Sequence, residues 1–163
     1  MSCLAWNYRG LRNLRTKREL VELIREKDPA VVFLAKTLID EVRLEFIQNS
    51  INFGHRWVVP KVGHSGGLVL YWRSLINLTI EGSNKIFMDV VIDRVLESEW
   101  HLTGFYGELN TARRNKVWDK LMSLNSRLER PWLCVVILIN LLDRMRNWEE
   151  QLNPITICNS LEM

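Results

Sequence analysis

The sequence predicts an α+β fold in which two sheets pack face to face with helices outside, a four-layer sandwich or part of one. Two observations lead to this class. At the start and at the end of the sequence, the spacing of the apolar residues predicts a strand, a helix and a second strand in succession. Between them, five segments alternate apolar and polar residues with a period of two, as half-buried antiparallel strands do. Helices and strands that follow one another in this way bury their apolar faces by forming layers.

The opening unit begins with a short apolar strand at residues 2–7, which stops in a loop that contains a glycine. A helix follows over residues 16–27, because leucine and isoleucine recur there at the spacing of one helix face. Asp28-Pro29 ends this helix, since the residue before a proline disfavours the helical conformation. Residues 30–35 are apolar without alternation, which is typical of a strand covered on both faces.

A second amphipathic helix is expected after this strand, with Leu44, Ile47 and Ile51 on one face and Asp40 as its N-cap. The apolar period then changes from that of a helix to that of a strand. It predicts successive strands of an antiparallel meander, separated by Gly, Ser, Asn and Asp. These strands cover residues 55–59, 67–73, 75–80, 85–92 and 100–106.

The closing unit has a third helix that begins at Asn110 and leads into the apolar strand Trp132–Ile139. Beyond this strand the pattern weakens to a charged stretch that an Asn-Pro pair interrupts. We therefore expect residues 1–142 to form one partial domain and residues 143–163 to form a divergent, loosely attached tail.

Composition limits the class of protein. The chain has 163 residues with 47% hydrophobic and 25% charged content, which fits one globular domain. Its net charge of +3 is compatible with a nucleic-acid partner but does not decide for one. Three cysteines without a C-x-x-C pair favour a reducing compartment, the nucleus or the cytoplasm. Neither a secretory signal nor a membrane-spanning apolar run is expected, and no small-molecule cofactor is evident.

Five short blocks stand in order along most of residues 1–142. They read A-W-N-Y-R-G-L at 5–11, V-F-L-A-K-T at 32–37, S-G-G-L-V-L-Y-W at 65–72, T-G-F-Y-G-E at 103–108 and R-P-W-L-C-V at 130–135. No single block is specific, but five in order are hard to obtain by chance. Together they resemble the N-terminal part of the endonuclease domain of plant LINE-type non-LTR retrotransposons, in the endonuclease/exonuclease/phosphatase superfamily.

This resemblance implies a DNase I-like αββα sandwich, here C-terminally truncated, that hydrolyses DNA phosphodiester bonds with Mg²⁺ or Mn²⁺. In the family, an Asn and a Glu belong to the metal shell, and they match Asn7 and Lys36. The tyrosine that supports the phosphate matches Tyr106. The Asp and Asn that orient and deprotonate the attacking water match Ile137 and Ile139.

Asn7 and Tyr106 are therefore retained, whereas the two acidic positions are not. Lys36 changes the local charge by two units beside the expected cation, and one unit pair at roughly 4 Å is worth about 4 kcal/mol at an effective dielectric of about 20. Ile137 cannot take a proton from water. A slip of one residue would place Asn140 on the family Asn but would supply no Asp. We expect an inactive endonuclease-like domain that binds no metal.

The alternative function is a non-catalytic nucleic-acid-binding module. Its candidate phosphate contacts are Arg9, Arg113 and Arg114, although a basic helix face such as the one around Arg113 is usually only solvated. A third possibility is that the chain forms no stable protein, since half of a sandwich exposes apolar strand surface. The G-H-S-G-G segment at 63–67 matches the G-x-S-x-G pattern of serine hydrolases, which we reject because a strand follows it.

Overall fold

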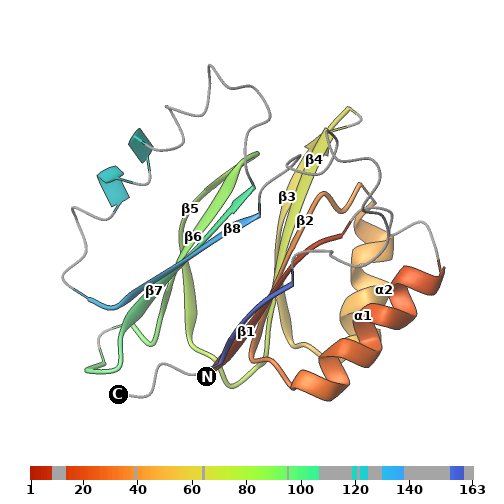
Figure 1. Cartoon of the computed structure of the whole chain (residues 1–163), viewed down its shortest axis with the longest axis horizontal. Helices are drawn as coiled ribbons and strands as arrows, with labels where there is room; N and C mark the ends of the chain where they lie inside the picture. The colour runs from red at the N-terminus through yellow and green to blue at the C-terminus, as the bar shows by residue number, and fades with distance from the viewer. Residues whose placement is uncertain are drawn as a thin grey trace, which may run out of the picture. The chain divides into compact units, whose positions relative to one another are not determined.

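The computed structural model describes residues 1–8, 14–38, 40–63, 65–94, 96–106, 119–120, 122–124, 130–137 and 155–159. The chain divides into two compact units (Figure 1). The first contains residues 1–76 and 153–163, and the second contains residues 77–152. Among the described residues, no helix is long and apolar enough to cross a membrane.

The first unit contains a five-stranded sheet with the order β3-β4-β2-β1-β9. Its strands are β1 (Ser2–Asn7), β2 (Val31–Ala35), β3 (His55–Val62), β4 (Ser65–Trp72) and β9 (Ile155–Asn159). β1 and β2 are parallel and are joined by α1 (Leu14–Lys27), which confirms the predicted opening unit. The remaining neighbours in this sheet are antiparallel.

Helices α1 and α2 (Glu41–Ile51) cover one face of this sheet (Figure 1). The apolar core beneath them is continuous, and it includes Leu4, Leu20, Ile24, Val32, Leu34, Leu44, Ile47, Val69 and Tyr71. Burying each such aliphatic side chain contributes about 1.5–3 kcal/mol, which fixes the helices on the sheet. Asp40 is the N-cap of α2, as predicted, because its side chain accepts a hydrogen bond from Arg43 N at 2.9 Å.

The second unit contains a four-stranded sheet with the order β5-β6-β7-β8. Its strands are β5 (Leu78–Asn84), β6 (Phe87–Ile92), β7 (Trp100–Tyr106) and β8 (Trp132–Ile137). β7 and β8 are parallel, as the predicted closing unit requires. Residues 119–120 and 122–124 between them are helical, and Leu124 packs with Phe87 and Phe105. The predicted start of this helix at Asn110 lies outside the described residues, as does the end of the predicted strand at Ile139.

The prediction of one continuous meander is wrong. β3 pairs with β4 in the first sheet, whereas β5, β6 and β7 pair with one another in the second. A turn separates the two groups: Ile76 N donates to Arg73 O at 2.9 Å, and Leu75 is 97% exposed. Strand β5, which was predicted to begin at Leu75, therefore begins at Leu78. Alternation in a sequence indicates a half-buried strand, but it does not specify the sheet to which the strand belongs.

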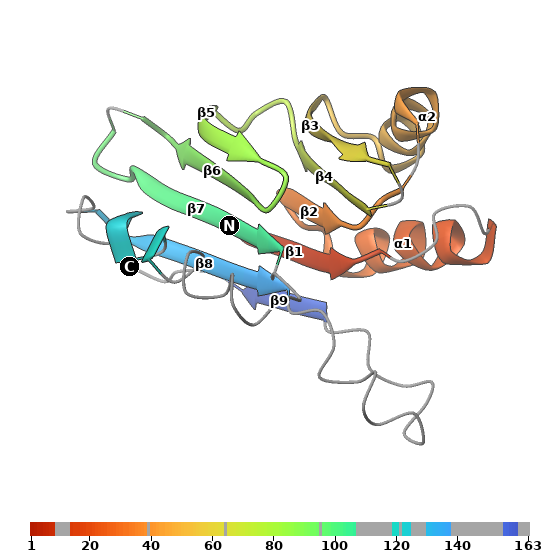
Figure 2. The same ribbon diagram turned by 90° about the horizontal axis from the view of Figure 1, so that it is seen from above.

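Strand β9 was not predicted. It pairs antiparallel with β1, from Ser2 opposite Asn159 to Trp6 opposite Ile155 (Figure 2). These five residues lie inside the segment 143–163, which was expected to be a divergent, loosely attached tail. The domain boundary after residue 142 lies outside the described residues and stays a prediction.

Candidate functional site

Asn7 is the last residue of β1 and lies opposite Ala35, the last residue of β2. Tyr8 N donates to Ala35 O at 2.9 Å, so the two parallel strands end at the same level. Asn7 is buried, and its Oδ1 has no hydrogen-bond partner among the described residues. A buried acceptor without a donor costs about 1–3 kcal/mol. A cation, a water molecule or a ligand donor at this strand end would therefore be stabilising.

Lys36 directly follows β2 and is partly buried. The structure thus brings together the two positions that the resemblance assigns to the metal shell, because Lys36 directly follows Ala35, the register partner of Asn7. The backbone of Lys36 is left-handed, with φ +58°, a conformation that non-glycine residues seldom adopt. Such a conformation persists only where the surrounding contacts hold it.

The contacts that hold this loop come from the β3–β4 hairpin. Thr37 is 2% exposed and donates its backbone N–H to Gly67 O at 3.2 Å. Lys61 Nζ donates to Leu38 O at 3.3 Å. We call residues 36–38 the β2-end loop. Thr37, Gly67 and Lys61 were not predicted as parts of the site; the paired glycines of the S-G-G-L block were the only signal of this packing in the sequence.

Gly67 is required by this packing. Its φ is +87°, and a Cβ at this position would lie 2.7 Å from Thr37 Oγ1 and 3.3 Å from Leu38 N. Only glycine allows both the backbone conformation and the close approach. Ser65 begins strand β4 and not a helix, so the structure also supports rejection of the serine-hydrolase pattern.

In the second unit, Tyr106 ends β7 and lies opposite Ile137, the last residue of β8. Both side chains are buried, with exposed fractions of 7% and 4%. The two family positions of this unit are therefore also neighbours, but the one that matches the catalytic Asp carries an aliphatic side chain. The other predicted site residues lie outside the described part of the chain: Arg9, Arg113, Arg114 and Ile139.

The residues at the ends of β1 and β2 do not fit a Mg²⁺ or Mn²⁺ ion. These cations prefer carboxylate and other oxygen ligands. Of the two residues, Asn7 offers one neutral oxygen, Oδ1, and Lys36 carries a positive charge that repels a cation. Among the described residues, no group of three or more His, Cys, Asp and Glu side chains is arranged to hold a metal.

A separate polar cluster crosses the second sheet and was not predicted. Thr103 Oγ1 donates to Asp89 Oδ1 at 2.6 Å and accepts from Trp132 Nε1 at 2.8 Å. Burial, with a smaller contribution from Asp89, raises the pKa of the Cys134 thiol to about 11. Because Thr103 is satisfied on both sides, this cluster links β6, β7 and β8 structurally.

Comparison with known proteins identifies the type of fold. No protein-family model matches the sequence. No curated protein matches it either. Among solved structures, the endonuclease domain of TRAS1, a telomere-specific non-LTR retrotransposon, matches with a TM-score of 0.59 and 10% identity, over 83% of this chain and 57% of that one. The chain has an endonuclease/exonuclease/phosphatase-type fold.

Two other structures of the endonuclease/exonuclease/phosphatase type agree. TDP2 from Caenorhabditis elegans matches with a TM-score of 0.54 and 12% identity, over 79% of this chain and 44% of that one. D. rerio TDP2 complexed with a single-strand DNA product matches with a TM-score of 0.56 and 12% identity, over 90% of this chain and 64% of that one. The predicted α+β fold class is confirmed, and the likeness to these structures shows the fold alone. The chain spans less than two thirds of the length of each of these proteins.

Proposed function

We propose that this chain is a retroelement-derived endonuclease-like domain that no longer hydrolyses phosphodiester bonds efficiently. The observation that carries the proposal is the placement of Lys36 beside Asn7, at the ends of two paired parallel strands. A lysine stands there where the resembling endonucleases have a metal-binding glutamate. The nuclease-like fold of the structural neighbours supports the ancestry, and the substituted side chains account for the loss.

Two chemical requirements of hydrolysis are unmet by these residues. Metal-assisted hydrolysis needs a divalent ion that stabilises the developing charge and lowers the pKa of its bound water. A lysine ammonium supplies one positive charge but cannot bind and acidify a water molecule in that way. Hydrolysis also needs a group that takes the proton from the attacking water, and Ile137 has no such group.

The test is a plasmid-nicking assay of the purified chain in Mg²⁺ and in Mn²⁺. We expect no nicking above a control without protein. Asn7→Ala controls for contaminating nucleases, because a contaminant would cut equally in both preparations. Nicking that depends on metal and disappears in Asn7→Ala would contradict the proposal. The Lys36→Glu, Ile137→Asp, Ile139→Asn triple variant asks whether restoring the family side chains restores cutting.

A second candidate function is binding of nucleic acid without cleavage. It is favoured by the likeness to D. rerio TDP2, which was solved with a single-strand DNA product, and by the net charge of +3. Arg9, Arg113 and Arg114 are its proposed phosphate contacts. Binding should weaken steeply with salt and with Arg113→Ala plus Arg114→Ala. Binding that ignores salt would exclude this function.

A further inference from the structure

We propose that strand β3 binds an extended acidic peptide, which pairs with the outer edge of the strand and places one carboxylate on the guanidinium of Arg56. This inference goes beyond the proposed function, because its ligand is a protein segment. Arg56 lies opposite Tyr71, and Tyr71 lies opposite Val32 near the start of β2. The peptide site is therefore at the other end of the strands from Asn7 and Lys36.

A cavity of about 480 Å³ opens at the start of β3. It is lined by residues 54–58, together with Glu41 and Gln48 of α2. Its volume is in the range of ligand-binding cavities. Because five consecutive residues line it, a ligand in this cavity lies alongside the first half of the strand.

The Arg56 side chain that lines this cavity is held in place by a buried glutamine. Arg56 Nη1 donates to Gln48 Oε1 at 2.5 Å. Gln48 is 8% exposed, and its Nε2 donates to Phe53 O at 3.0 Å. The amide of Gln48 is thus bonded at both its oxygen and its nitrogen, so the guanidinium has a fixed partner. An arginine that is already held in position loses less side-chain entropy when it binds an anion.

The guanidinium also has donors that remain for a ligand. An arginine has five N–H donors. Among the described residues, the only carboxylate paired with Arg56 is Glu41, whose Oε1 is 3.8 Å from Nη2, too far for a hydrogen bond. The Glu41 side chain is 79% exposed, and such an ion pair contributes little. A ligand carboxylate can therefore replace it and accept two parallel hydrogen bonds. One guanidinium balances one negative charge, which favours a carboxylate over a doubly charged phosphate.

The position of β3 in the sheet indicates an extended peptide as the source of that carboxylate. β3 is the end strand of the order β3-β4-β2-β1-β9 (Figure 2). An edge strand presents a row of backbone N–H and C=O groups, with which a peptide can pair. Proline and lysine block such pairing, and β3 has both, Pro60 and Lys61, in its second half. Residues 55–59 contain neither, so the part of the edge beside Arg56 can accept a strand.

The test measures binding of a fluorescein-labelled, end-capped peptide to the whole chain by anisotropy. The peptide alternates threonine and valine and carries one central glutamate, and a second version has glutamine in its place. The glutamate peptide should bind roughly tenfold more tightly, as one charged hydrogen bond predicts. Arg56→Gln should remove this preference, and Glu41→Gln should strengthen binding because it removes the competing carboxylate. Arg18→Gln is the matched control, since Arg18 is an exposed arginine on α1.

Hydrogen exchange gives a second readout, because strand pairing should slow the exchange of backbone amides in residues 55–59. Equal affinity for the two peptides, equal losses in Arg56→Gln and Arg18→Gln, or unchanged exchange in β3 would overturn the inference. Binding of an oligonucleotide, but not of the peptide, that depends on Arg56 would assign the cavity to a phosphate and would overturn it too. If thermal melts show that Arg56→Gln does not fold, Arg56→Lys replaces it. This variant keeps the charge but lacks the planar fork, so it should also reduce the preference for glutamate.

Discussion

Gly67 lies so close to Thr37 that a Cβ on the glycine would be 2.7 Å from the threonine Oγ1. The backbone of the same pair is joined by the hydrogen bond from Thr37 N to Gly67 O. The hairpin between β3 and β4 therefore serves as a support for the β2-end loop. The left-handed conformations of Lys36 and Leu38 at +58° and +51° depend on that support.

Gly67→Ala should destabilise the chain because its methyl group would meet Thr37 and because φ is +87°. Gly66→Ala is the matched control: its φ is +82°, but nothing lies within 4 Å of the added Cβ. The control should lose about 1–2 kcal/mol from backbone strain alone. Gly67→Ala should lose about 1–3 kcal/mol more from overpacking. Urea unfolding measures the free energy of unfolding of both variants. Equal losses would show that the contact between the added methyl group and Thr37 does not destabilise the chain.

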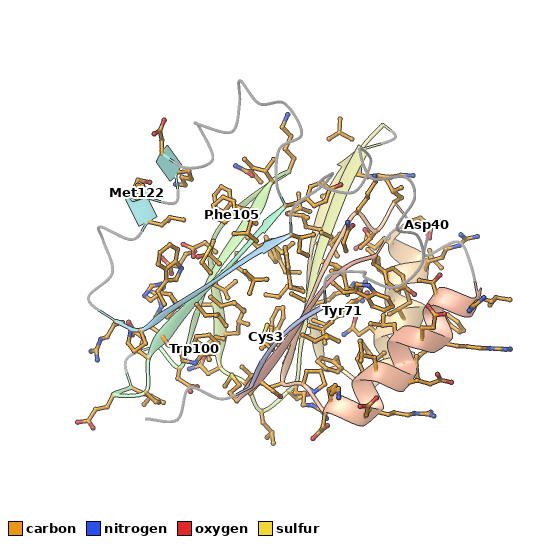
Figure 3. The ribbon with its side chains drawn as sticks, viewed as in Figure 1. Cys3, Asp40, Tyr71, Trp100, Phe105 and Met122 are labelled. Atoms are coloured by element: carbon orange, nitrogen blue, oxygen red, sulfur yellow. The ribbon has the colours of Figure 1, made fainter. Side chains whose placement is uncertain are left out.

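Tyr71 and Tyr8 make a second matched pair. Both are fully buried on the helix side of the first sheet, where Tyr71 points toward α2 (Figure 3). Tyr71 OH donates to Leu44 O at 2.9 Å, whereas Tyr8 OH has no partner among the described residues. Burial raises the pKa of both phenols far above the usual 10.0.

Tyr71→Phe should therefore lower the free energy of unfolding by about 0.5–1.5 kcal/mol, the net value of one hydrogen bond. Tyr8→Phe removes a hydroxyl that is buried without a described partner, so it should be neutral or stabilising. Thermal melts of both variants at neutral pH provide the measurement. A loss in Tyr8→Phe as large as that in Tyr71→Phe would mean that the Tyr8 hydroxyl is satisfied in solution.

The helices and the parallel units were predictable because they depend on local pattern. Leu20 and Ile24 lie one helical turn apart and are both buried on α1, and Asp40 caps α2 through a residue three positions away. Sheet membership is not local. β4 and β5 are separated by a short turn but belong to different sheets, and β9 reaches β1 from the other end of the chain.

The candidate site was predictable only as single residues. The resemblance pointed to Asn7 and Lys36, and the parallel pairing of β1 with β2 places both at neighbouring strand ends. The support around them could not be predicted. Gly67 and Lys61 come from a hairpin that is remote in sequence, and no periodicity connects a strand end to the loop that contacts it.

The Cys134 thiol should react with iodoacetamide with a midpoint near pH 11, because burial and Asp89 raise its pKa from 9.0 to about 11. Asp89→Asn should lower that midpoint while keeping an acceptor for Thr103. Glu97→Gln, an exposed acid of the same unit, should not change it. Peptide mapping after alkylation follows Cys134 alone, and a midpoint near 9 in the wild-type chain would contradict the burial of the thiol.

The same shift predicts how stability changes with pH. The pKa of Cys134 is higher in the folded chain than in the unfolded one, so the folded state binds the proton more tightly. The stabilisation is therefore complete below pH 9 and is lost as the pH rises toward 11. Cys134→Ser, with no titrating thiol at this position, should show a smaller fall over that range in urea unfolding.

Metal affinity should depend on the charge at position 36. Lys36→Glu exchanges a positive charge for a carboxylate one residue beyond Ala35, the register partner of Asn7. This is a change of two charge units at the ends of β1 and β2. At about 4 kcal/mol for a unit pair at an effective dielectric of about 20, one of these two charge units alone corresponds to roughly a thousandfold in affinity. Calorimetric titration with Mg²⁺ and Mn²⁺ should detect binding to Lys36→Glu and none to the wild-type chain.

Lys27→Glu makes the same charge change at the opposite end of the strands, and it should bind no metal. If it gained affinity equally, net charge and not position 36 would govern binding. If the wild-type chain itself bound Mn²⁺ tightly, the charge of Lys36 would not exclude a divalent cation from the ends of β1 and β2. The chain would then be a candidate nuclease with a bound metal, and only the missing proton acceptor at Ile137 would still oppose hydrolysis.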